Sequence, residues 1–114
     1  MPIVPVFLME ESKGQKNDRE KPDLSLIPMD ALWEMARAFT YGAHKYGRHN
    51  YREGIEISRL LAASMRHITQ FNEGEDYDEE SKALHLGNAM AGLAMAIYMY
   101  KNKPEMDNRY KVKK

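Results

Sequence analysis

A short run of carboxylates is the densest chemical feature of the sequence. Glu75, Asp76, Asp78 and Glu80 lie close together directly after Gly74. Hard divalent cations such as Mg²⁺ prefer oxygen ligands, usually one or two carboxylates together with phosphate oxygens. The run follows a predicted helix end, where the helix dipole disfavours negative charge and a cation would compensate. The four residues are therefore candidate metal ligands. The alternative is a solvated loop, because charge runs are weak evidence for a ligand.

Two histidines flank this carboxylate run. His67 precedes it and His85 follows it, with Asn88 one helical turn after His85. Two helices joined by a short loop run antiparallel, so the end of one faces the start of the next. We therefore expect the imidazoles to meet near the carboxylates as catalytic groups, with Asn88 as a substrate ligand. The alternative is that each histidine is a hydrogen-bonded core residue.

Basic and aromatic side chains gather around the first predicted interhelical turn. Arg offers a planar fork of donors to phosphate, while aromatic rings stack on bases and Asn can pair with a base edge. The candidate phosphate ligands are Lys45, Arg59 and Arg66, with Arg48 nearby, and the candidate base or sugar ligands are Tyr41, Tyr46, Asn50 and Tyr51. They could equally be solvated cations paired with glutamates and ordinary turn or core aromatics.

Three helices are predicted to carry these side chains, over about 28–44, 58–72 and 80 or 81–102. Pro28 suits a first helical turn, and Ser58 is a candidate N-cap. The third segment is apolar nearly all round, which is typical of a helix buried on more than one side. The predicted fold class is all-α, with a bundle of about three helices per chain that homo-oligomerisation completes.

Length and composition indicate one domain of 114 residues with no net charge and no cysteine. We expect an N-terminal arm over 1–27, a helical nucleotide-binding domain over 28–102 and a polar C-terminal tail over 103–114. Zero net charge argues against a duplex nucleic acid partner, and the lack of cysteine excludes a thiolate metal site. The apolar residues 3–9 are too few and lack the basic start of a signal peptide, so we expect a cytoplasmic protein without membrane contact.

Several spaced blocks resemble a family of phage domains found at the N-terminal part of dATP/dGTP diphosphohydrolase. The resemblance covers roughly 13–100 and rests on the blocks KPDLSLIP at 21–28, YGAHKYG at 41–47, SRLL at 58–61, RH at 66–67, GEDYDEES at 74–81 and HL at 85–86. It implies a fold akin to the MazG-like all-α pyrophosphatases, which are homo-oligomers. It also implies Mg²⁺ or Mn²⁺ and cleavage of a purine deoxynucleoside triphosphate to monophosphate and pyrophosphate, in an infected host cell.

One departure from this wider group keeps a second hypothesis open. Its usual Glu-Glu-x-x-Glu and Glu-x-x-Asp patterns are replaced here by Arg66-His67-x-x-Gln70 and His85-x-x-Asn88. If the chain is an enzyme, we expect the metal to move to the carboxylate run, assisted by the two histidines. The alternative is a non-catalytic protein that sequesters a nucleotide or a nucleotide-derived immune signal. A helical assembly module that binds no small molecule is a third reading.

Overall fold

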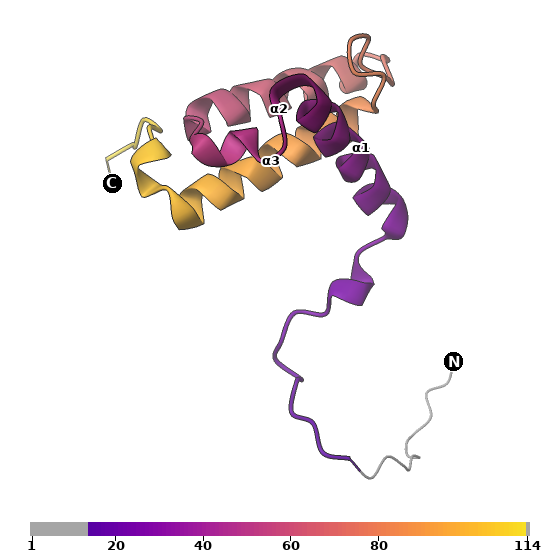
Figure 1. The fold of residues 1–114 in the computed structure, drawn as a ribbon, viewed down its shortest axis with the longest axis vertical. Coiled ribbons are helices and arrows are strands. Elements are labelled where there is room, and N and C mark those ends of the chain that lie inside the picture. The colour runs from indigo at the N-terminus through magenta and orange to yellow at the C-terminus, as the bar shows by residue number, and fades with distance from the viewer. Residues whose placement is uncertain (1–13, 114) are drawn as a thin grey trace.

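Three helices form the body of the protein in a computed structural model that describes residues 14–113. The elements are, in order, η1 (Leu24–Leu26), α1 (Met29–Tyr46), η2 (Asn50–Glu53), α2 (Ile57–Asn72), α3 (His85–Asn102) and η3 (Pro104–Met106). Helices α2 and α3 lie side by side and antiparallel, and α1 packs against α3 (Figure 1). The described part contains no strand beyond an isolated bridge, so the all-α prediction is confirmed.

Small residues let α3 approach both of the other helices closely. A Cβ at Gly87 would lie 2.5 Å from the backbone oxygen of Glu34 in α1, and one at Gly92 would lie 2.2 Å from Ser64 Oγ in α2. Ser64 is buried, and its hydroxyl donates a 2.8 Å hydrogen bond to the carbonyl oxygen of Ala89. The α2–α3 contact therefore combines close packing with a satisfied buried hydroxyl group.

Helix α3 begins at His85, so the predicted start at residue 80 or 81 was wrong. The preceding residues form a hairpin-like loop in which Asp78 N donates to the carbonyl oxygen of Ala83 at 2.8 Å and Tyr77 bridges Leu84. Lys82 has a φ of 63°, which a right-handed helix does not allow. The loop thus brings its polar side chains back against the first turn of α3.

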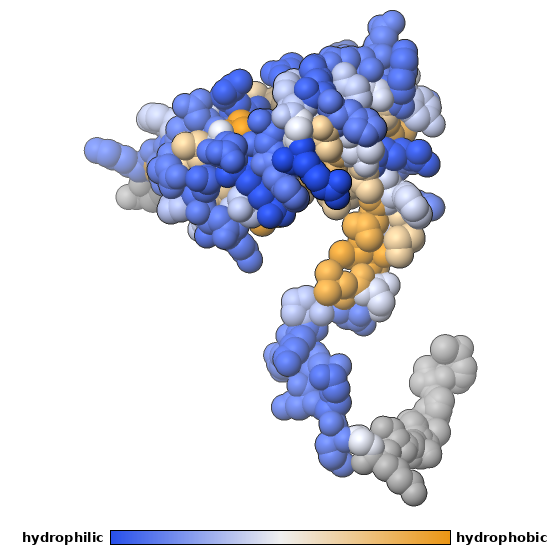
Figure 2. Space-filling model, viewed as in Figure 1, coloured by the Kyte–Doolittle hydropathy of each residue, from blue (hydrophilic) through white to orange (hydrophobic). Residues whose placement is uncertain are grey.

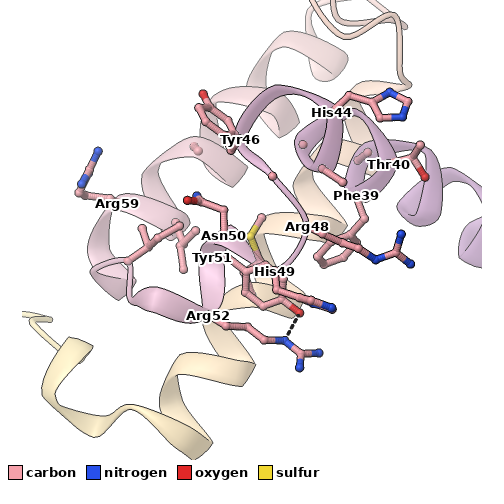
Figure 3. Close-up of a pocket in the computed structure, with 18 of the residues that line it drawn as sticks. Phe39, Thr40, His44, Tyr46, Arg48, His49, Asn50, Tyr51, Arg52 and Arg59 are labelled. Atoms are coloured by element: carbon pink, nitrogen blue, oxygen red, sulfur yellow. Dashed lines mark hydrogen bonds between the residues drawn. The ribbon is translucent and has the colours of Figure 1, made fainter.

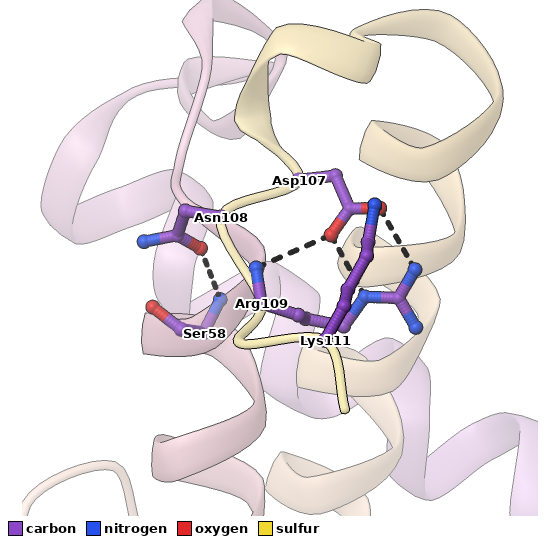
Figure 4. A network of polar contacts seen from close by, with 5 residues as sticks. All are labelled: Ser58, Asp107, Asn108, Arg109 and Lys111. Carbon is purple, nitrogen blue, oxygen red and sulfur yellow. Dashed lines mark hydrogen bonds and ion pairs between the residues drawn. The ribbon is translucent and has the colours of Figure 1, made fainter. Parts of the chain in front are cut away.

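The start of α2 is capped from the C-terminal tail, so the prediction of Ser58 as the N-cap was wrong. The N-cap residue is Glu56, which makes no side-chain cap. Instead, Ser58 N donates to Asn108 Oδ1 at 3.0 Å, and Asp107 binds Arg109 at 2.7 Å beside it (Figure 4). Met106 packs against the core cluster of Ile57, Leu60, Ala96 and Met99. The first part of the tail therefore closes the helical body.

The described part of the predicted arm, residues 14–27, extends away from the helices and is exposed throughout (Figure 1). Apolar side chains lie exposed where it joins α1, among them Leu24, Leu26 and Trp33 (Figure 2). Residues 1–13, and with them the expectation of no signal peptide at 3–9, lie outside the described residues. Within residues 14–113, no helix has the length and apolar character needed to cross a membrane.

Candidate functional site

The two predicted histidines meet between α2 and α3. His67 lies in the second half of α2, and His85 is the first residue of α3 and is fully buried. Their Nδ1 atoms are 2.9 Å apart, and their ring planes are tilted by 41°. The antiparallel arrangement expected from the sequence therefore does bring these imidazoles together next to the acidic loop.

Asp78 completes a cluster with the two histidines. One ligand atom from each of His67, Asp78 and His85 lies within 4.8 Å of the others, which makes this group a candidate metal centre. Asp78 Oδ2 accepts a 2.8 Å hydrogen bond from Ser81 N. Burial raises the pKa of Asp78, but the hydrogen bonds from Ser81 outweigh it and leave the pKa below its usual value. Burial also lowers the pKa of His67, so at neutral pH the cluster offers a carboxylate and a neutral imidazole.

Glu75 stands behind the buried imidazole of His85. Its Oε2 lies 3.3 Å from His85 Nε2, at the distance of an ion pair. The contact lacks the alignment of a hydrogen bond, so Nε2 remains a buried nitrogen without a hydrogen-bond partner among the described residues. Asp76 contributes its backbone instead, because its carbonyl oxygen accepts from His85 N at 2.9 Å. These two predicted ligands therefore orient His85, and Asp78 is the loop carboxylate in the cluster.

Three further predicted residues tie the acidic loop to α1. Glu80 Oε2 accepts from Tyr41 OH at 2.6 Å and also binds Lys45 Nζ. Lys45, and then Tyr41, hold the pKa of Glu80 below its usual value. Asn88 has a similar role from α3, where its Nδ2 donates to Oγ of the loop residue Ser81 at 3.1 Å. In this arrangement these four side chains contact one another or the loop, and none of them lines the pocket described next.

A pocket of about 980 Å³ lies between α1, the α1–α2 connection and α2 (Figure 3). Five of the predicted substrate ligands line it, namely Tyr46, Asn50, Tyr51, Arg59 and Arg66. Sequence reasoning missed His44, His49 and Arg52, which also line it. The available signal was the density of basic residues over 44–52, HKYGRHNYR. The lining includes four arginines and no Asp or Glu, so its charged groups at neutral pH are all cations.

The side chains in the pocket differ in how firmly they are held. Tyr51 packs edge-on between Phe39 and Tyr98, with ring centroids 5.7 and 5.5 Å away, so it belongs to the scaffold. Arg52 Nε donates to Tyr51 OH at 3.2 Å. Tyr46, by contrast, is 62% exposed. Arg48, Arg59 and Arg66 form no ion pair with any carboxylate of the described residues.

The pocket and the metal cluster are neighbours but separate. Neither His67 nor His85 lines the pocket. Arg66, which does, directly precedes His67 in α2, so their Cα atoms are about 3.8 Å apart and their side chains diverge by about 100°. The charge of Arg66 also contributes, after burial and the proximity of His85, to the lowered pKa of His67. Arg66 therefore stands at the boundary between the arginine-lined pocket and a candidate metal centre.

Comparison with known proteins places the chain in a family. Residues 11–109 match the family model described as dATP/dGTP diphosphohydrolase, N-terminal. Over 96 residues the chain is 38% identical to the dATP/dGTP diphosphohydrolase of Salmonella phage PMBT28, a match that covers 84% of this chain and 33% of that protein. The chain thus spans about one third of the length of this relative. No solved structure matches it. From the family match and this identity, the chain belongs to the family of dATP/dGTP diphosphohydrolase N-terminal domains.

Proposed function

We propose that this chain binds a purine deoxynucleoside triphosphate in the α1–α2 pocket and cleaves it to a monophosphate and pyrophosphate with the aid of a divalent cation. The observation that carries the proposal is the charge of the pocket. Arg48, Arg59 and Arg66 line it without a carboxylate partner in the described residues. Guanidinium groups in this state are free to donate charge-assisted hydrogen bonds to phosphate oxygens. The pocket volume of about 980 Å³ is at the upper end of ordinary small-molecule sites and would admit a nucleotide.

The base would lie toward the α1–α2 connection. Tyr46 is the exposed aromatic ring of the pocket, and Asn50 is the amide beside it. A ring of this kind stacks on a base, and an amide can both donate to and accept from a base edge. The purine preference is supported by the name of the phage relative, a dATP/dGTP diphosphohydrolase. In the proposal Tyr51 shapes this end of the pocket from the core side.

Phosphates would run from Arg59 past Arg66 toward the cluster of His67, Asp78 and His85. A divalent cation held there, which the sequence leads us to expect as Mg²⁺ or Mn²⁺, would neutralise phosphate charge and polarise the attacked phosphorus. Two members of the cluster, His67 and Asp78, are half-buried and within reach of water, so they would hold the cation on the side from which the attacking water molecule arrives. His85 is fully buried and would hold it from the core side, next to His67. In the proposal Lys45, Tyr41 and Glu80 hold the loop that carries Asp78.

The test is a panel of nucleotides incubated with the purified full chain, with and without Mg²⁺ or Mn²⁺, and analysed by chromatography. We expect metal-dependent formation of monophosphate and pyrophosphate, fastest for dATP and dGTP. Arg66→Gln should weaken substrate binding about 10- to 100-fold, the loss expected for charge-assisted hydrogen bonds. Arg37→Gln is the matched control, because Arg37 lies on α1 outside the pocket. Equal effects of the two substitutions would refute this placement of the phosphates.

Sequestration without turnover is the second candidate function, and one observation favours it. The pocket contains no carboxylate, and the candidate metal centre lies beside it rather than in its wall. Such a pocket would hold an anionic nucleotide without cutting it. The same experiment separates the two functions. A sequestering protein depletes the free nucleotide, which returns intact after the protein is denatured.

We also propose that the protein works as a homodimer formed through α3. Leu93, Ile97 and Tyr100 are 42%, 59% and 62% exposed, and with Leu86 and Met90 they repeat at spacings of three and four residues. This is the pattern of a helix seam that packs against another helix. A second copy of the chain offers the same apolar stripe and so fits it by two-fold symmetry. The proposal agrees with the expectation that α3 is buried on more than one side.

A further inference from the structure

The ligand atoms of the candidate metal centre differ from those expected of a magnesium site. His67 and His85 supply imidazole nitrogens and Asp78 supplies one carboxylate. Mg²⁺ prefers six oxygen ligands in an octahedron, whereas imidazole suits Zn²⁺ and other first-row transition ions. We propose that His67, Asp78 and His85 form a site for one transition-metal ion per chain, with Zn²⁺ as the best fit, and that the Glu75 carboxylate attracts the other ring N–H of His85. The inference deepens the proposed function by naming the ion, but it concerns metal binding alone.

The spacing of the two imidazoles fits a shared ion. Metal–nitrogen bonds to Zn²⁺ are about 2.0–2.1 Å, so two nitrogens on one ion lie about 2.8–3.4 Å apart for angles between 90° and the tetrahedral value. The Nδ1 atoms of His67 and His85 are 2.9 Å apart, at the lower end of this range. Asp78 approaches the same point, with all three ligand atoms within 4.8 Å. Two neutral nitrogen lone pairs this close repel each other unless a proton or a cation lies between them.

The position of Glu75 favours one nitrogen of His85, Nδ1, as the atom that can bind an ion. A metal-bound histidine usually donates its other ring N–H to a carboxylate, which fixes the tautomer and the ring orientation. Here the Glu75 carboxylate lies 3.3 Å from His85 Nε2, which is buried and otherwise unpartnered. A proton on Nε2 is attracted by that carboxylate, whereas a lone pair there would face negative charge. Nδ1 of His85 is then the unprotonated atom, and it points toward His67.

The competing account is a simple hydrogen bond from His67 Nδ1–H to His85 Nδ1, with no metal. It accounts for the 2.9 Å contact equally well. It assigns no role to Asp78, however, whose carboxylate Ser81 N holds beside both rings. The pocket lacks such a combination of ligands, since its histidines His44 and His49 have no carboxylate among the lining residues.

Calorimetric titration of the full chain, chelator-treated and with any affinity tag removed, tests the proposal in the absence of nucleotide. We expect one Zn²⁺ per chain, bound at least 100-fold more tightly than Mg²⁺. Asp78→Asn and His67→Gln should each weaken Zn²⁺ binding more than 10-fold. Glu75→Gln should weaken it about 10- to 100-fold, as is usual when the group that orients a metal-bound histidine is removed. His85 is left unchanged, because it is fully buried and its substitution could unfold the protein. Circular dichroism checks that each variant keeps its helix content.

Two controls make the result specific to these residues. Glu79→Gln removes an exposed carboxylate of the same loop, and His44→Gln removes a pocket histidine; neither should change Zn²⁺ affinity. Co²⁺ in place of Zn²⁺ should give visible absorption bands that disappear in His67→Gln. The proposal is overturned if Mg²⁺ binds as tightly as Zn²⁺, or if folded His67→Gln binds Zn²⁺ as the wild type does. Because no nucleotide is present, neither result bears on the pyrophosphatase proposal, which the turnover assay tests separately. A failure to detect turnover in that assay would likewise not overturn the metal-binding proposal.

Discussion

Two glycines in the helices should respond in opposite ways to the same substitution. Gly87 lies in α3 and Gly42 in α1. Helix propensity alone predicts that Ala stabilises the protein at either position, by up to about 1 kcal/mol. The space around them differs, because a Cβ at Gly87 would lie 2.5 Å from Glu34 O and 2.9 Å from Glu34 C, whereas a Cβ at Gly42 would meet nothing within 4 Å.

For Gly87→Ala, the free-energy cost of steric repulsion should exceed the gain in helix propensity. The atoms that the new methyl group meets belong to the backbone of α1, so they cannot rotate away as a side chain would. Helices α1 and α3 must move apart by a good part of an ångström, and overpacking of this kind costs about 1–3 kcal/mol. Against a propensity gain of up to about 1 kcal/mol, we expect Gly87→Ala to lower the free energy of unfolding by about 1–2 kcal/mol. Gly42→Ala should raise it by about 0.5–1 kcal/mol.

Urea denaturation followed by circular dichroism measures both changes, at one protein concentration because dimerisation would couple stability to concentration. The thermal midpoint offers a second readout, with a shift of roughly 4–8 °C per kcal/mol expected for a domain of this size. The reasoning fails if Gly87→Ala is as stable as the wild type while Gly42→Ala behaves as expected. That outcome would mean that α1 does not approach α3 as closely as the structure shows.

Three further predictions concern the tail, the acidic loop and the apolar stripe. Asn108→Ala should lower the free energy of unfolding by about 1 kcal/mol, since it removes the acceptor at the start of α2; an unchanged urea midpoint would count against the cap. Glu80 has a pKa below its usual value of 4.5, so its stabilising contribution is present above that pH and is lost as the pH falls through the lower folded value. The stability difference between wild type and Glu80→Gln should therefore be small at neutral pH, shrink below pH 4.5 and weaken with salt, because both ion-pair side chains are largely exposed. Ile97→Glu should convert the dimer to a monomer in light scattering, whereas a wild type that is already monomeric would contradict the proposed interface.

Features that depend on neighbouring residues could be predicted from the sequence alone. A helix is held by bonds between residues four apart, so apolar spacing and a proline at residue 28 sufficed to place α1 and α2 within two residues at each end. The meeting of His67 and His85 was predictable for the same reason, because a short loop between two helices leaves them antiparallel. The family blocks were recognisable along the chain without knowledge of the contacts they make.

The tertiary structure decided which partner each polar side chain meets. Lys45 was a candidate phosphate ligand, yet Glu80, 35 residues away, binds it. Ser58 looked like a cap, but Asn108 supplies the acceptor from 50 residues away. The sequence by itself thus determined the helices and their order, since local bonds form them. Only the folded chain brought the pocket arginines together and placed Asp78, rather than Asp76 or Glu75, beside the two histidines, since both arrangements depend on contacts that local helix bonds do not specify.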